Sequence, residues 1–158
     1  MPGFTGISNQ IDPTAVVKNA PFWPDINLAE FQAAYRLPPD YSDGLLKDRL
    51  SLAMLWANGE LKGFQHEQQQ TGVQTLDEVP VDDGERLGGV HPKVMHYTRA
   101  VCCHAKALLL ADYATLHRRN DAQADTMESP EAADRWRSES FAALSQIRES
   151  LSIMVEAL

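Results

Sequence analysis

Apolar residues recur at intervals of three and four over most of the chain, the spacing that places them on one face of a helix. The pattern predicts four helices, over about residues 28–36, 43–70, 92–118 and 130–154. Residues outside these runs follow neither a helical nor a strand period. We therefore expect an all-α fold, a four-helix, bundle-like body with an extended N-terminal arm and a long acidic loop. The expected division is an arm over 1–25 and a helical domain over 26–158.

The first helix has the clearest start signal. Asn27 is a good cap, and Glu30 stands three residues later, as in a capping box. Ile26 and Phe31 have the spacing of a hydrophobic staple across the same start. After Leu37 two prolines follow, which remove amide donors and end the helix.

The second helix is expected to run unbroken from a serine cap at Ser42 to about residue 70. Its apolar face comprises Leu46, Leu50, Ala53, Ala57, Leu61 and Phe64, broadened by Leu45, Leu52 and Trp56. Gly59 and Gly63 each weaken the helix by about 1 kcal/mol relative to alanine. Their four-residue spacing favours close packing against another helix.

The last two helices differ in their apolar patterns. Between Val101 and Ala111 apolar residues fall on more than one side, which is typical of a central, buried helix. The final helix starts at Ser129 and Pro130 and has a nearly unbroken seven-residue apolar repeat from Ala133 to Leu158. Such a repeat predicts packing along the length of another helix.

The segment before the first helix is broken up by proline and glycine, with scattered apolar residues. We expect either an arm that becomes ordered on a neighbouring subunit or a flexible terminus. Phe22, Trp23 and Pro24 end this segment, and such aromatic side chains must bury against something. They either cover the chain's own core or anchor another subunit.

The connection over 73–91 is long, acidic and rich in glycine, as functional or mobile loops often are. Its acidic residues are Asp77, Glu78, Asp82, Asp83 and Glu85. The alternating oxygen ligands and closing glutamate of an EF-hand are missing, so the loop does not predict a calcium site.

Composition places the chain among ordinary globular proteins, with 158 residues, 44% hydrophobic and 23% charged. A net charge of −8 argues against a surface that coats nucleic acid. No apolar run is long enough to span a bilayer, and the N-terminus has no signal-peptide pattern. We therefore expect a protein made in the cytoplasm, with no membrane partner.

Candidate chemistry is sparse. Cys102 and Cys103 are adjacent in a helical pattern and poorly placed to pair, so buried free thiols are expected. No two histidines have the spacing of metal ligands on one helix face, and His104 is expected to be a hydrogen-bonded core residue. Because no nucleophile elbow, phosphate loop or dinucleotide motif is present, we predict no catalytic site, no metal and no cofactor.

Three stretches, Phe22–Leu37, Arg99–Leu110 and Val155–Leu158, resemble one known family, the head completion (gpL-type) proteins of contractile-tailed phages. A weaker stretch runs from Arg99 to Leu110, and a third is the closing Val155–Leu158. The strongest stretch comprises Phe22, Trp23, Pro24, Asp25, Ile26, Leu28, Ala29, Glu30, Phe31, Ala34, Arg36 and Leu37.

The resemblance implies a structural virion protein at the neck between capsid and tail. Such proteins are expected to form a homo-oligomeric ring of about a dozen copies that matches the symmetry of the portal protein. The ring would retain the packaged genome, let DNA pass without sequence-specific binding and support a neck or tail-terminator protein. The implied subunit or portal contacts are Phe22, Trp23, Pro24, Ile153, Met154, Val155 and Leu158.

The acidic side chains of the 73–91 loop are then expected to face the channel or to be mobile. An alternative from the residues alone is a monomeric or dimeric helical ligand-binding or regulatory domain that uses this loop as its site.

Overall fold

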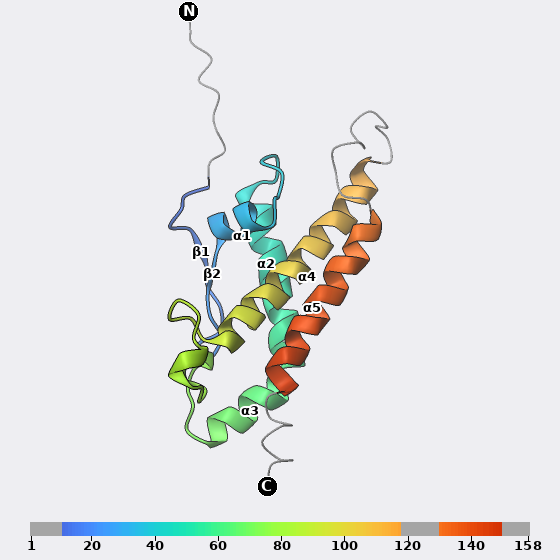
Figure 1. Cartoon of the computed structure of the whole chain (residues 1–158). Helices are drawn as coiled ribbons and strands as arrows, with labels where there is room; N and C mark the ends of the chain where they lie inside the picture. Colours follow the sequence, from blue (N-terminus) through green and yellow to red (C-terminus); the bar gives the residue numbers. More distant parts are fainter. Residues whose placement is uncertain (1–10, 118–129, 150–158) are drawn as a thin grey trace, which may run out of the picture.

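The computed structural model describes residues 11–117 and 130–149, and this part of the chain is mostly helical (Figure 1). The all-α prediction is confirmed, with the addition of one small two-stranded sheet. The described elements are β1 (Val16–Val17), β2 (Ile26–Asn27), α1 (Leu28–Ala34), α2 (Asp43–Glu60), α3 (Lys62–Gln70), η1 (Leu76–Glu78), η2 (Asp83–Glu85), α4 (Pro92–His117) and α5 (Pro130–Glu149).

Helix α4 is the centre of the fold. Helix α5 packs along it, and α2 packs against another side of it (Figure 1). Because neighbours cover it from several directions, Ala100, Val101 and Ala105 are fully buried. The prediction of a central, buried helix is therefore confirmed.

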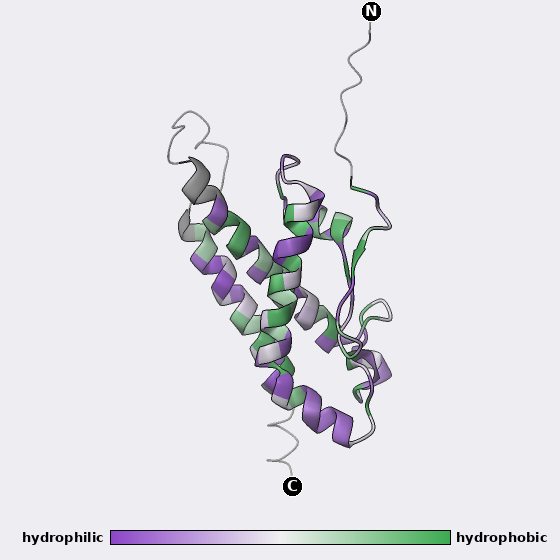
Figure 2. Cartoon of the chain, turned by 180° about the vertical axis from the view of Figure 1, so that it is seen from behind, coloured by the Kyte–Doolittle hydropathy of each residue, from purple (hydrophilic) through white to green (hydrophobic). Residues whose placement is uncertain are grey.

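Helix α5 uses the predicted repeat, as far as it is described, to pack on α4. Ala133, Ser140, Leu144 and Ile147 are buried, and they recur at spacings of three, four and seven residues. In Figure 2 the exposed side of this helix is mainly hydrophilic. The later part of the repeat, from Leu151 to Leu158, lies outside the described residues.

The predicted single helix over 43–70 is wrong, because the structure contains two helices. Helix α2 ends at Glu60, and Leu61 leaves the helical conformation with φ −101° and ψ 12° before α3 begins. A side chain at Gly59 or Gly63 would meet open space, so these glycines do not serve close packing. They flank the break, where the backbone freedom of glycine lowers the stability of a continuous helix. Leu61 itself stays fully buried.

The start of α1 is built as its sequence predicts. The Asn27 side chain accepts a hydrogen bond from the Glu30 backbone N–H at 2.9 Å. Ile26 and Phe31, the two staple residues, are both buried. This cap fixes where the chain turns from β2 into the first helix.

Residues 11–27 form a hairpin on the helical body. β1 and β2 are antiparallel, with Val16 opposite Asn27 and Val17 opposite Ile26. Ile11, Val17 and Ile26 are buried in the same core as the helices. The segment expected as an extended arm is therefore packed on the chain's own body from Ile11 onward.

The 73–91 connection is held in place by buried side chains. Leu76 is 1% exposed, and its backbone N–H donates to the Phe22 carbonyl at 2.9 Å. His91 is also buried and its Nε2 lies 2.8 Å from the Val79 carbonyl oxygen. Gly88 and Gly89 have positive φ values of 57° and 79°, which permit the tight turn before α4.

None of the helices within residues 11–117 and 130–149 combines the length and the apolar character that crossing a membrane requires.

Candidate assembly surfaces

Phe22 and Trp23 lie in the loop of the hairpin and are 3% and 4% exposed. The Trp23 ring stacks on Tyr97 of α4, with centroids 4.8 Å apart and an interplanar angle of 12°. Phe22 meets the edge of Trp23 at 4.7 Å, and Trp23 Nε1 donates to Gln65 Oε1 at 3.3 Å. Of the two uses that the sequence left open, these side chains take the first and cover the chain's own core. Contact with another subunit stays a prediction.

A closed ring of three hydrogen bonds joins the same loop to α2 and α4. Asn19 Nδ2 donates to the Tyr97 hydroxyl oxygen at 2.8 Å, and Tyr97 donates to Asn58 Oδ1 at 2.5 Å. Asn58 Nδ2 completes the ring by donating to Asn19 Oδ1 at 3.0 Å. Burial raises the pKa of Tyr97, so the hydroxyl stays protonated and remains a donor.

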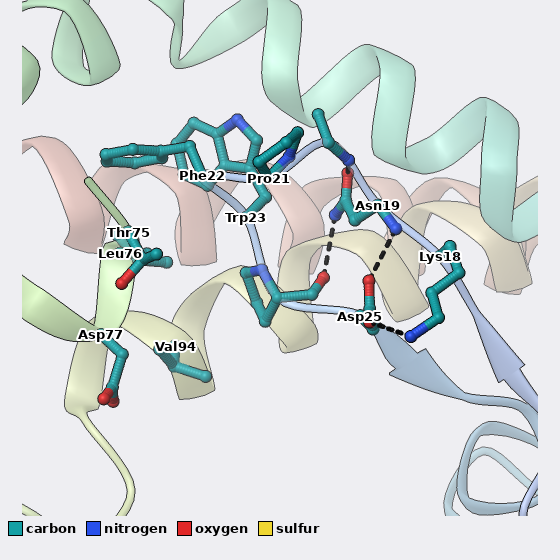
Figure 3. Close-up of a pocket in the computed structure, with 12 residues that line it drawn as sticks. Lys18, Asn19, Pro21, Phe22, Trp23, Asp25, Thr75, Leu76, Asp77 and Val94 are labelled. Carbon is teal, nitrogen blue, oxygen red and sulfur yellow. Dashed lines mark hydrogen bonds and ion pairs between the residues drawn. The ribbon is translucent and has the colours of Figure 1, made fainter.

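Beside this loop lies an open pocket of about 540 Å³ (Figure 3). Asp25 is held at its edge by the Asn19 backbone N–H at 2.7 Å and by Lys18 Nζ at 3.1 Å. The Asn19 hydrogen bond lowers the pKa of Asp25, so this carboxylate stays ionised. Half-buried Pro24 is also in the lining, together with Thr75, Leu76 and Asp77 of the 73–91 loop. Among the described residues no three histidine, cysteine or acidic side chains gather as a metal site would require.

The acidic residues of the 73–91 loop are all exposed. Asp77 pairs with Arg86 at 3.0 Å, and the Glu78 carboxylate accepts the Gln74 backbone N–H at 3.0 Å. Asp82, Asp83 and Glu85 are exposed on and around η2. The remaining predicted contacts, Ile153, Met154, Val155 and Leu158, lie outside the described residues.

A second cavity, of about 570 Å³, opens between α1 and the first half of α4, and we call it the α1–α4 groove. Its lining is mainly apolar and includes Phe31, Val94, Met95 and Cys102. Cys102 and Cys103 are free and buried, as the sequence predicts. Burial raises the pKa of Cys102 to about 12, so its thiol is unreactive at neutral pH.

Sequence reasoning missed an exposed apolar surface where α2 and α5 meet, which we call the α2–α5 seam. It consists of Leu52, Leu55, Trp56 and Phe141. The Trp56 ring stacks on His104 of α4, with centroids 3.9 Å apart, and meets the edge of Phe141 at 5.3 Å. The sequence did carry a signal for this surface, because Leu55 lies about 150° around the helix from the centre of the buried face that Leu46, Leu50 and Leu61 form.

His104, under the seam, differs from the expected hydrogen-bonded core histidine. Its ring is partly buried, and Nδ1 has no hydrogen-bond partner among the described residues. Burial, with a smaller contribution from the Arg137 charge, lowers the pKa of His104. The imidazole is therefore neutral at pH 7 and serves as a flat surface for Trp56.

The described part of the chain is a helical protein built around one long central helix, with the α1–α4 groove and the α2–α5 seam as its apolar surfaces. The chain belongs to the phage head completion protein (GPL) family, whose model matches residues 17–158. It is similar to the head completion/stabilization protein of Escherichia phage P2, with 31% identity over 116 residues. That alignment covers 72% of this chain and 67% of the relative. No solved structure matches the chain.

Proposed function

We propose that this protein completes the phage head as a homo-oligomeric ring bound beneath the portal after DNA packaging. The ring retains the genome and presents the platform on which a neck or tail-terminator protein docks. The observation that carries the proposal is the family match, which spans residues 17–158 and so includes the hairpin from Val17 onward, the helical body and the C-terminal segment. The similar phage P2 protein is named for head completion and stabilization.

The symmetry of the portal sets the number of copies in this proposal, about a dozen, because a closed ring needs one repeated contact between neighbours. The net charge of −8 suits a channel along which DNA slides without adhering. Exposed Asp77, Glu78, Asp82, Asp83 and Glu85 are the candidate channel-facing side chains. The apolar C-terminal residues are the candidate contacts to the portal.

Electron microscopy of the purified protein mixed with its portal tests the proposal. We expect a ring-on-ring complex, with density for this protein on the side of the portal that faces the tail. A protein that stays monomeric beside the portal, even at concentrations that favour weak association by mass action, would contradict it.

A second candidate function, a ligand-binding domain, is favoured by the pocket in Figure 3, because Thr75, Leu76 and Asp77 of the 73–91 loop line it. This function requires that a small molecule raise the unfolding temperature of the isolated chain. It also requires that Asp77→Ala reduce the effect of that molecule. A chain that forms portal-bound rings and shows no such shift in a broad screen excludes it.

A further inference from the structure

We propose that neighbouring copies of this protein associate head to tail, with the α2–α5 seam of one copy seated in the α1–α4 groove of the next. This contact rests on the proposed ring and identifies the surfaces from which the ring is built. A repeated contact between two different surfaces is the kind that closes into a ring when the rotation between copies permits it.

The seam projects large apolar side chains into solvent. Leu55 is 69% exposed, Phe141 48% and Leu52 46%. Together they expose on the order of 300 Å² of apolar surface, a patch size that is often functional in proteins otherwise covered by polar groups. Trp56 lies between them, held by its stack on His104 and its edge contact with Phe141. The seam is therefore a preformed surface with a rigid aromatic centre.

The seam is bounded along α2 by ion pairs to neighbouring helices. Arg49 Nε lies 2.5 Å from Asp112 of α4, about one turn before Leu52. Arg148 of α5 lies 3.2 Å from Glu60, about one turn after Trp56. An apolar centre inside a polar rim is the usual anatomy of a protein–protein interface.

The α1–α4 groove offers a concave surface of matching character. Buried Phe31 and Cys102 contribute to its lining, and the more exposed side chains there include Met95, 44% exposed, and Val90, 41% exposed. Its polar side chains include Glu30, His96 and Arg99. A volume of about 570 Å³ accommodates several leucine-sized side chains, which is what Leu52 and Leu55 of a neighbour would insert.

The two surfaces lie on opposite sides of α4. His104 is under the seam, whereas Met95 and Cys102 line the groove. At about 100° per residue, His104 points about 180° away from Met95 and about 160° away from Cys102. Figure 2, the view from behind, shows α2 nearest the viewer, whereas α4 is nearer in Figure 1. Because seam and groove face opposite directions, each copy can contact one neighbour on either side.

The areas favour a second copy as the occupant. A specific interface of ordinary size covers about 800 Å² on each partner, of which a little over half is apolar. The seam supplies most of that apolar share with three exposed side chains and the Trp56 ring. A mainly apolar groove of about 570 Å³ is present on the opposite side of the same chain, so the partner surface needs no other protein.

Cross-linking through one introduced cysteine per chain tests this contact in the full-length protein, whose native Cys102 and Cys103 are buried. Leu55→Cys in the seam and Met95→Cys in the groove are both solvent-exposed positions, so neither substitution disturbs the core. The two variants are purified separately, one with a size tag, mixed with portal and oxidised under mild conditions. Gln69→Cys, at an exposed position on α3, replaces one partner in a matched control.

We expect a disulfide-linked dimer of unequal chains when L55C and M95C are mixed, and no comparable product with Q69C. A chain that carries both substitutions should form a ladder of linked copies. Peptide mass spectrometry identifies the bond between positions 55 and 95, and buried Cys102 and Cys103 should stay unlinked. Symmetric 55–55 dimers, or portal-bound rings without any bond between seam and groove, would overturn the inference.

The failure of this inference and that of the proposed function give different results. Rings seen by electron microscopy with no seam–groove linkage leave the head completion ring in place and refute only this contact. If residues 150–158 of a neighbour occupy the groove instead, M95C forms a disulfide with a cysteine introduced at Leu158 and not with L55C. Absence of rings with and without portal refutes both proposals together.

Discussion

Trp23 and Trp56 each stack on a side chain of α4. The Trp23 pair is closed, which means buried, whereas the Trp56 pair is open, which means partly exposed to solvent. Trp23 lies on Tyr97 with Phe22 and Gln65 covering it, and it is 4% exposed. Trp56 lies on His104, and the ring at its edge, Phe141, is itself half-exposed.

The polar atoms of the two pairs differ in the same way. The Tyr97 hydroxyl belongs to a complete hydrogen-bond ring with Asn19 and Asn58, whereas Nδ1 of His104 has no partner among the described residues. Satisfied polar groups and full burial mark a stack that holds the fold together. The incomplete stack lies beside exposed leucines, and we propose that a neighbouring copy covers it.

The largest expected difference between the two stacks is in stability. Trp23→Ala leaves a cavity in the core and should lower the free energy of unfolding by about 3–5 kcal/mol. Trp56→Ala should cost clearly less, about 1–2 kcal/mol, because this ring is only partly buried. Denaturant unfolding of both variants measures the difference. Equal losses would show that the two stacks are equivalent in the fold.

The hydrogen-bond ring should contribute less than the Trp23 stack. Asn58→Ala removes one donor and one acceptor from partly buried partners, at a cost of about 1–3 kcal/mol. Asn19→Ala should cost a similar amount. Because both residues belong to one ring, the double variant should lose less than the sum of the two single losses. Strict additivity in this double-mutant cycle would contradict a connected ring.

A smaller effect is expected in the pH dependence of stability. Burial and Arg137 hold the pKa of His104 below its ordinary value of 6.5, so the unfolded chain takes up this proton first as pH falls. The free energy of unfolding therefore falls as pH drops from about 6.5 to the lowered pKa of the folded state.

His104→Gln should remove this part of the decline. We expect the difference in unfolding free energy between about pH 7 and pH 5 to be smaller in the variant than in the parent. His96, whose pKa is lowered mainly by burial, keeps its contribution in both proteins. Parallel declines in the two proteins would show that His104 is not the responsible group.

The smallest stability effect is expected at the seam itself. Leu55→Ser changes a side chain that is 69% exposed, so the free energy of unfolding should change by less than about 0.5 kcal/mol. Assembly on the portal should nevertheless weaken, because the exposed apolar centre is lost. Gln69→Ala, at an exposed position of α3 outside the seam and the groove, is the control and should assemble normally. A Leu55→Ser protein that assembles like the parent would count against the seam.

Local signals predicted much of the fold. The Asn27 cap, the central burial of α4 and the packed face of α5 all follow from spacing along a single helix. The break at Leu61 was missed because its apolar period continues through it, and only the two flanking glycines weaken the helix there. β1 and β2 have two residues each, too few for an alternating pattern to be visible.

The candidate surfaces were harder to predict because they depend on contacts between distant residues. Asn19 and Tyr97 are 78 residues apart, and nothing in the local sequence of Trp23 shows that Tyr97 lies beneath it. Phe22 and Trp23 were predicted as subunit or portal contacts; the structure shows that both are buried in the chain's own core, and their contact with another subunit stays a prediction. Leu55 and Phe141 were overlooked, because only the packing of α2 and α5 on α4 brings them to one exposed surface.

The contrast between the closed and the open stack is tested most directly by hydroxyl-radical footprinting of the full chain, alone and in complex with portal. In the free chain Trp23 should be protected, while Phe141 and Met95 should be modified. On assembly Phe141 and Met95 should both become protected, with no change at Trp23. Modification of Trp23 in the free chain, or equal modification of Phe141 and Met95 in both states, would contradict our assignment of core and interface.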